Sequence, residues 1–145
     1  MSDVKRMSLI KPTVETPFHI DFDWWKNHDN NWRVFLFNCL CAEHQDLFKQ
    51  VNDNNWVDWI DPVTAEVHQV DGLQYILITH CAKQPGFITS QSVLVDAVFR
   101  TFLANGNTPT SIDEIGKQIG KSTNVILRTL SGSHVYKGIR PIQKL

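Results

Sequence analysis

The C-terminal third of the chain places its apolar residues at the spacing of three successive helices. Apolar positions recur every three or four residues from Val93 to Leu103, and this pattern stops at Asn105-Gly106-Asn107. A second, shorter pattern follows Ser111 and ends at Gly120, and a third covers residues 125–130. The pattern therefore predicts three helices connected by short turns.

Residues with capping preferences mark the ends of these helices. Ser111 and Glu114 have capping-box spacing, in which the hydroxyl and the carboxylate satisfy free amides of the first turn. The third helix is expected to begin at Ser122 or Thr123 and to end at Ser131-Gly132-Ser133, before an extended segment over residues 134–141. Two helices joined by a three- or four-residue turn that contains Gly form the geometry that places a second helix in a DNA groove.

This order of elements resembles the winged-helix branch of the helix-turn-helix superfamily over about 50 residues. The resemblance implies a recognition helix over residues 123–130, a wing over residues 134–140, and double-stranded DNA as the partner of a cytoplasmic, transcription-associated regulator. The residues that it implies for base or phosphate contact are Lys121, Ser122, Thr123, Asn124, Arg128, His134, Lys137 and Arg140.

A protein-interaction module is the alternative function. The recognition helix contains one Arg and no Lys, and other winged helices act as protein-contact modules. In that case the chain is an adaptor subunit of a larger assembly. The sequence does not specify an oligomeric state.

The N-terminal part mixes short strand and helix patterns. Residues 18–22 alternate apolar and polar positions, which predicts a strand, and Asp23 is the expected N-cap of a short helix. Residues 32–48 predict one longer helix. Alternation over residues 56–61 and 66–71, on either side of a Pro-containing turn, predicts a β-hairpin.

A further helix over residues 73–80 precedes the Pro85-Gly86 pair, which we take as the boundary between two units. The chain then divides into an irregular arm (residues 1–17), a helix and hairpin unit (18–86) and the winged helix-turn-helix (87–145). The expected fold class is α+β, with the helical N-terminal unit packed on the C-terminal one.

Composition and charge are those of a soluble protein with an uneven charge distribution. Hydrophobic residues make up 42% of the 145 residues, and no apolar run approaches the roughly 20 residues of a membrane span. No signal-peptide pattern follows the N-terminus, so we expect a cytoplasmic location and do not expect a membrane partner. Residues 1–86 carry 7 Lys/Arg against 12 Asp/Glu (−5), whereas residues 87–145 carry 7 against 3 (+4), a modest basic excess for phosphate contact.

Cysteine and histidine spacing predicts a structural zinc site. Cys41 and His44 have the Cys-x2-His spacing that presents two ligands from one tight turn, and His80-Cys81 supplies a second pair. Thiolate and imidazole both suit Zn²⁺, and three cysteines fit reduced thiols or ligands better than a disulfide framework.

Two alternatives to this ligand set stay open. Successive side chains on one helix diverge by about 100°, so His80 and Cys81 are awkward as joint ligands, and His68 on the hairpin is a substitute for His80. The cysteines are also residues of a type that is often buried, and Cys39 has the spacing of a helix-core position.

The sequence predicts a protein without catalytic activity. It contains no Gly-rich phosphate loop, no Gly-x-Ser-x-Gly and no His-Glu-x-x-His motif. A Cys–His nucleophile, with Cys41 or Cys81 as thiolate, is the remaining catalytic alternative. The five tryptophans between residues 24 and 59 are interpreted as core rather than as base-stacking residues, because their surroundings are acidic.

Overall fold

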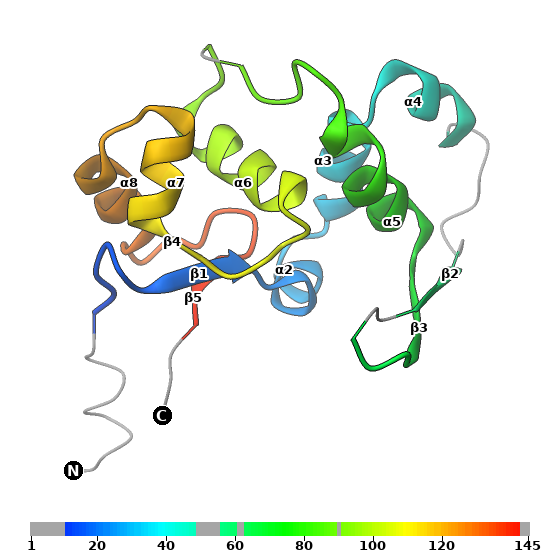
Figure 1. Cartoon of the computed structure of the whole chain (residues 1–145), viewed down its shortest axis with the longest axis horizontal. Coiled ribbons are helices and arrows are strands. Elements are labelled where there is room, and N and C mark those ends of the chain that lie inside the picture. Colours follow the sequence, from blue (N-terminus) through cyan, green and yellow to red (C-terminus); the bar gives the residue numbers. More distant parts are fainter. Residues whose placement is uncertain (1–10, 49–55, 61–62, 90, 143–145) are drawn as a thin grey trace.

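The computed structural model describes residues 11–48, 56–60, 63–89 and 91–142. Most of its helices lie to one side of a small antiparallel sheet, and a β-hairpin projects at the end of the molecule away from that sheet (Figure 1). The fold class is therefore α+β, as predicted. None of the helices in these ranges is long and apolar enough to cross a membrane.

The N-terminal strand lies in the middle of the three-stranded sheet. Strand β1 (Pro17–Ile20) pairs antiparallel with β4 (Thr110–Ser111) on one side and with β5 (Ile139–Pro141) on the other. The predicted strand over residues 18–22 is thus confirmed over most of its length. Phe18 and Ile20 alternate with half-buried neighbours and are themselves buried, at 0% and 1% exposure.

One asparagine extends the hydrogen bonding of β1 beyond the sheet. The backbone N–H of Ile20 donates to Asn107 Oδ1 at 2.8 Å, and Asn107 Nδ2 donates to the Ile20 carbonyl at 2.9 Å. Asn107 lies in the turn after α6 (Leu94–Ala104) with a φ of 60°, a left-handed conformation that Asn tolerates better than most residues. Both backbone groups of a buried residue are thereby satisfied.

A single hydrophobic core joins the two units that the sequence predicts on either side of Pro85-Gly86. Trp25 of α2 (Phe22–His28) packs edge-on against Phe99 of α6, with ring centroids 5.3 Å apart. Phe35 of α3 (Trp32–Cys39) packs against the same ring at 5.1 Å. Aromatic pairs in this arrangement add stabilisation beyond their buried area.

Two local predictions for the N-terminal part are wrong. Asp21, not Asp23, caps α2, because its carboxylate accepts from the backbone N–H of Trp24 at 3.0 Å. The helix expected over residues 32–48 is two helices, α3 and α4 (Ala42–Phe48). Leu40 separates them in an extended conformation, with its side chain buried in the core.

The predicted hairpin is confirmed. Strands β2 (Trp56–Ile60) and β3 (Val67–Asp71) pair antiparallel, with Ile60 opposite Val67. Asp71 then caps α5 (Gly72–Thr79), because its carboxylate accepts from the N–H of Leu73 at 2.9 Å. The same carboxylate pairs with Arg33 of α3, so the hairpin, α5 and α3 are fixed to one another. A 3₁₀ turn, η1 (Cys81–Lys83), follows.

The helix pair of the C-terminal part forms where the capping residues predict. Ser111 caps α7 (Ile112–Ile119) through the N–H of Glu114 at 3.2 Å, and Ser122 caps α8 (Thr123–Leu130). Gly120 ends α7 in the left-handed region, with a φ of 69°. A Cβ at Gly116 would lie 2.5 Å from Thr123 Cγ2, so a glycine is required where α8 begins against α7.

The segment predicted to be extended over residues 134–141 turns at residues 137–138 and is a strand only at its end. Only Ile139–Pro141 form a strand, and β5 pairs with the N-terminal strand β1 instead of with a hairpin partner. Lys137 and Gly138 both have positive φ, 52° and 75°, which interrupts an extended chain. The loop over residues 131–138 therefore turns back onto α2, where the N–H of Asp21 donates to the Gly138 carbonyl at 2.7 Å.

We predict that Gly138→Ala destabilises the protein more than Gly106→Ala does. Both glycines have positive φ, but a Cβ at Gly138 would lie 2.7 Å from Trp25 Cβ and 2.9 Å from the Asp21 carbonyl oxygen, whereas one at Gly106 meets nothing within 4 Å. Backbone strain costs about 1–2 kcal/mol in both variants, and the collision adds about 1–3 kcal/mol at Gly138. Urea unfolding measures both, and equal losses of stability would contradict the close approach of this loop to α2.

Candidate metal centre and nucleic-acid interface

Breaks in two helices position the predicted metal ligands. Cys41 immediately precedes α4, and its carbonyl accepts the first helical hydrogen bond, from Gln45 at 2.9 Å. His44 lies one turn further along. The Cys-x2-His pair therefore opens a helix, whereas the sequence pattern had it closing one. The break at Leu40 is what brings this pair beside the C-terminal end of α5.

The ligand atoms of the two pairs converge. Those of Cys41, His44 and His80 all lie within 4.8 Å of one another, close enough to hold one metal ion. Cys81 is not one of these three, but its Sγ lies beside two of them, 3.5 Å from Cys41 Sγ and 3.7 Å from His44 Nδ1. Cys41 Sγ and His44 Nδ1 are 3.0 Å apart. The rings of His44 and His80 meet edge-on, with centroids at 4.5 Å.

His80 and Cys81 do not belong to one helix. His80 ends α5 with φ −126° and ψ −63°, and η1 begins at the next residue. The divergence of about 100° between successive side chains of one helix therefore does not apply to this pair. The sequence also offers His68 as a ligand in place of His80, but the side chain of His68 lies outside the described residues.

Burial controls the ionisation of two of the thiols. Cys81 is 1% exposed, and burial raises the pKa of its thiol to about 11. Cys39 is 4% exposed in the hydrophobic core, as predicted for a core residue, and burial raises the pKa of this thiol to about 11 as well. A divalent ion bound at Cys81 would displace the thiol proton, because the thiolate is the ligand.

The predicted recognition helix presents a polar face to solvent. Ile126 and Leu130 are buried in the core, and the opposite side of α8 carries exposed Asn124 and Arg128, which are four residues apart on one helix face. Exposed Lys121 precedes the N-cap of α8, in the turn after α7. Ser122 is exposed too, but its hydroxyl caps α8, and half-buried Thr123 packs on Gly116.

The predicted wing cations contact the protein itself. Arg140 forms an ion pair with Asp21 at 3.0 Å, and its guanidinium lies 5.2 Å from the centre of the Trp24 ring. The ammonium of Lys137 lies 4.5 Å from the centre of the Phe35 ring. His134 is exposed and packs edge-on against Tyr136 at 4.5 Å. The two cations contact the protein because the turn at residues 137–138 directs this loop toward α2.

Sequence reasoning missed a cavity at this contact. Trp24, His28 and Tyr136 line it, and no motif singled out these three residues. The interpretation of the tryptophans as core holds for Trp25, which is 1% exposed, but Trp24 is only half-buried. The side chains of Trp56 and Trp59 lie outside the described residues. Only the folding of the 131–138 loop onto α2 creates the cavity, so local sequence carries no signal for it.

Comparison with protein-family models, with curated proteins and with solved structures finds no match to this chain. The metal-ligand cluster and the α8 face therefore carry the functional proposal by themselves.

We predict that the buried thiols react slowly with an alkylating agent at neutral pH in metal-free protein. Burial raises the pKa of Cys39 and Cys81 from the ordinary 9.0 to about 11, so the reactive thiolate fraction falls about a hundredfold. The rate should rise with pH until about 11, because each thiol is protonated below its pKa. Mass spectrometry of alkylated peptides measures each site, and a fast-reacting Cys81 at pH 7 would instead favour the Cys–His nucleophile.

Proposed function

We propose that the protein holds one structural zinc ion with Cys41, His44, His80 and Cys81, and that it binds double-stranded DNA through the exposed face of α8. The closeness of the Cys41, His44 and His80 ligand atoms, with Cys81 Sγ beside two of them, supports the first statement. The exposed positions of Asn124 and Arg128 on one face of α8, with Lys121 just before the helix, support the second.

The ligand chemistry favours zinc. Two thiols and two imidazoles suit Zn²⁺, whereas Mg²⁺ and Ca²⁺ take oxygen ligands. A tetrahedral ion at about 2.3 Å from sulfur and about 2.0 Å from nitrogen separates two sulfurs by about 3.8 Å, and a sulfur from a nitrogen by about 3.6 Å. The corresponding distances here are 3.5 Å between the sulfurs, and 3.0 Å and 3.7 Å from them to His44 Nδ1.

A structural role follows from the ligand count and from the position of α4. Four protein ligands complete a tetrahedral shell and leave no open position for a substrate. Helix α4 has no buried side chain among its described residues, and a helix of 7 residues is marginal by itself. Zinc would attach α4 to the α5–η1 junction and add to the hydrogen bond from Gln45 Nε2 to the Leu40 carbonyl at 3.1 Å.

The α8 face offers three kinds of contact to a duplex. Arg128 is suited to a guanine edge or a phosphate, Asn124 to an adenine edge, and Lys121 to a phosphate near the start of the helix. Of the 5 Lys/Arg in residues 111–142, Lys121 and Arg128 lie at α8 and are the cations that the proposal uses for phosphate contact. The proposal rests on α8 and does not use the loop cations, because Lys137 and Arg140 contact Phe35 and Asp21.

A protein partner is the second candidate, and one exposed apolar side chain favours it. Val125 is 42% exposed, and its position three residues before Arg128 makes the two side chains neighbours on the surface of α8. Binding that persists at high salt would point to this partner, because apolar burial is screened much less than charge contacts are.

We predict that Cys41→Ser loses zinc and that Cys39→Ala retains it. The first change removes a ligand, so affinity should fall by more than the roughly 10–100-fold that follows the loss of a hydrogen bond to a ligand. The second is the matched control, because Cys39 is a buried thiol of the core outside the ligand cluster. Elemental analysis of purified protein should give one zinc per chain for the parent and for Cys39→Ala. A parent without zinc, or with zinc that survives Cys41→Ser, would contradict the site.

We predict that Arg128→Ala weakens duplex binding and that Lys83→Ala does not. Loss of the Arg128 contact should cost about 1–3 kcal/mol and lower the slope of log affinity against log salt by about 1. Lys83 is the control cation, exposed in η1, where its ammonium donates to the Ala104 carbonyl at 3.2 Å. Fluorescence anisotropy with a random duplex of about 30 base pairs, over a range of salt, measures both. If the two variants bind equally, α8 is not the interface.

A further inference from the structure

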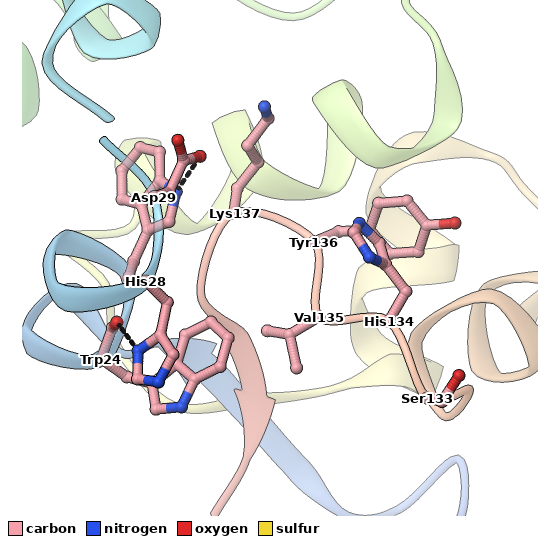
Figure 2. A pocket seen from close by; sticks show the side chains of 9 residues that line it. Trp24, His28, Asp29, Ser133, His134, Val135, Tyr136 and Lys137 are labelled. Carbon is pink, nitrogen blue, oxygen red and sulfur yellow. Dashed lines mark hydrogen bonds between the residues drawn. The ribbon is translucent and has the colours of Figure 1, made fainter. Parts of the chain in front are cut away.

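A cavity of about 510 Å³ lies between α2 and the loop over residues 131–138. Its size is within the usual range for small-molecule sites, about 300–1,000 Å³. Figure 2 shows Trp24 and His28 on the α2 side and His134 and Tyr136 on the loop side, with Val135 between them. The cavity lies apart from the metal ligands and from the exposed residues of α8, so it is a third site.

Flat rings form both sides of this cavity. Trp24 and His28 are stacked in parallel, with centroids 4.0 Å apart and 9° between the planes. His134 and Tyr136 meet edge-on at 4.5 Å. A planar aromatic ligand can lie against the flat Trp24–His28 stack on one side and meet the edge-on His134–Tyr136 pair on the other.

The polar atoms at the cavity are mostly neutral groups that donate and accept. His28 uses Nδ1 for the Trp24 carbonyl at 2.6 Å, which leaves Nε2 for a ligand. In the described part of the chain, the ring nitrogens of His134 and the hydroxyls of Tyr136 and Ser133 have no hydrogen-bond partner. Groups of this type match the amino, carbonyl and ring-nitrogen edges of a heterocycle.

The charges at the cavity do not select an anion. Asp29 and Lys137 both line it and oppose each other. The N–H of Asn31 donates to Asp29 at 2.8 Å and lowers the pKa of this carboxyl, which stays ionised at neutral pH and disfavours a negative ligand beside it. The Lys137 ammonium lies over the Phe35 ring. The selected ligand is therefore a neutral ring with hydrogen-bonding edges.

The walls are held in place before any ligand arrives. Gly138 fixes the loop to α2 through the hydrogen bond between its carbonyl and Asp21, and the Arg140–Asp21 ion pair crosses the same contact. Trp25 donates from Nε1 to Asp29 at 3.0 Å, which fixes the side of the cavity nearest the core. A preformed site loses less conformational entropy on binding.

We propose that this cavity binds a nucleobase, with its ring between the Trp24–His28 pair and the His134–Tyr136 pair. The base belongs to a free nucleoside or to an unpaired position of a single strand, since both offer the same ring and edges. The inference does not depend on duplex binding by α8, because it uses different residues.

The test is a titration of the full-length protein with the four common nucleosides and with short single strands of each base. Isothermal titration calorimetry and tryptophan fluorescence report binding. At least one base should bind, and His134→Ala should weaken it about 5–100-fold, the usual effect of losing a ring that contacts a base. Binding of nucleosides identifies a free ligand, whereas binding of single strands alone identifies an unpaired base in a strand.

Two further variants make the result decisive. Tyr136→Phe keeps the ring and its packing but removes the hydroxyl, so it should fold normally and weaken binding by a smaller factor. Arg128→Ala changes the exposed α8 face and should leave nucleoside binding unchanged, even where it abolishes duplex binding. No binding of any probe, or binding that His134→Ala leaves intact, overturns the proposal.

Discussion

The pairing of β1 between β4 and β5 is the interaction on which the rest of the structure depends. It connects residues 17–20 with residues 110–111 and 139–141, so the N-terminal segment becomes the central strand of a sheet whose other two strands come from the C-terminal part of the chain. Asn107 adds two hydrogen bonds to the backbone of Ile20. Strand β1 leads directly into α2, and this places Trp25 against Phe99 of α6. One core results, and every candidate site lies around it.

The sites follow from this arrangement in different ways. The α8 face requires only local features, namely the caps at Ser111 and Ser122 and the glycine at position 116 that lets α8 begin beside α7. The metal ligands require two breaks in helical structure, at Leu40 and at His80. The cavity requires the long-range contact of the 131–138 loop with α2. The absence of a side chain at Gly138 permits this close approach.

The sequence predicted features that depend on neighbouring residues better than features that depend on contacts distant in the chain. Capping residues and periodicity placed α7, α8 and the β2–β3 hairpin, because these depend on neighbours in the chain. The break at Leu40 has no Gly or Pro to mark it, since burial of this side chain in the core produces it. The wing was misjudged because its partner strand comes from the other end of the chain. Ligand type and spacing indicated Cys41, His44 and His80, although not the backbone turn at His80 that unites the two pairs.

The convergence of the two Cys–His pairs on one ion is the central claim, and zinc K-edge X-ray absorption of the purified protein tests it most directly. The account predicts a four-coordinate site with two sulfur ligands at about 2.3 Å and two nitrogen ligands at about 2.0 Å. A spectrum with oxygen ligands in the coordination shell, or with a single sulfur, would contradict it. A single sulfur would mean that only one of Cys41 and Cys81 binds the ion, and a shell of oxygen ligands would mean that the zinc lies elsewhere on the protein.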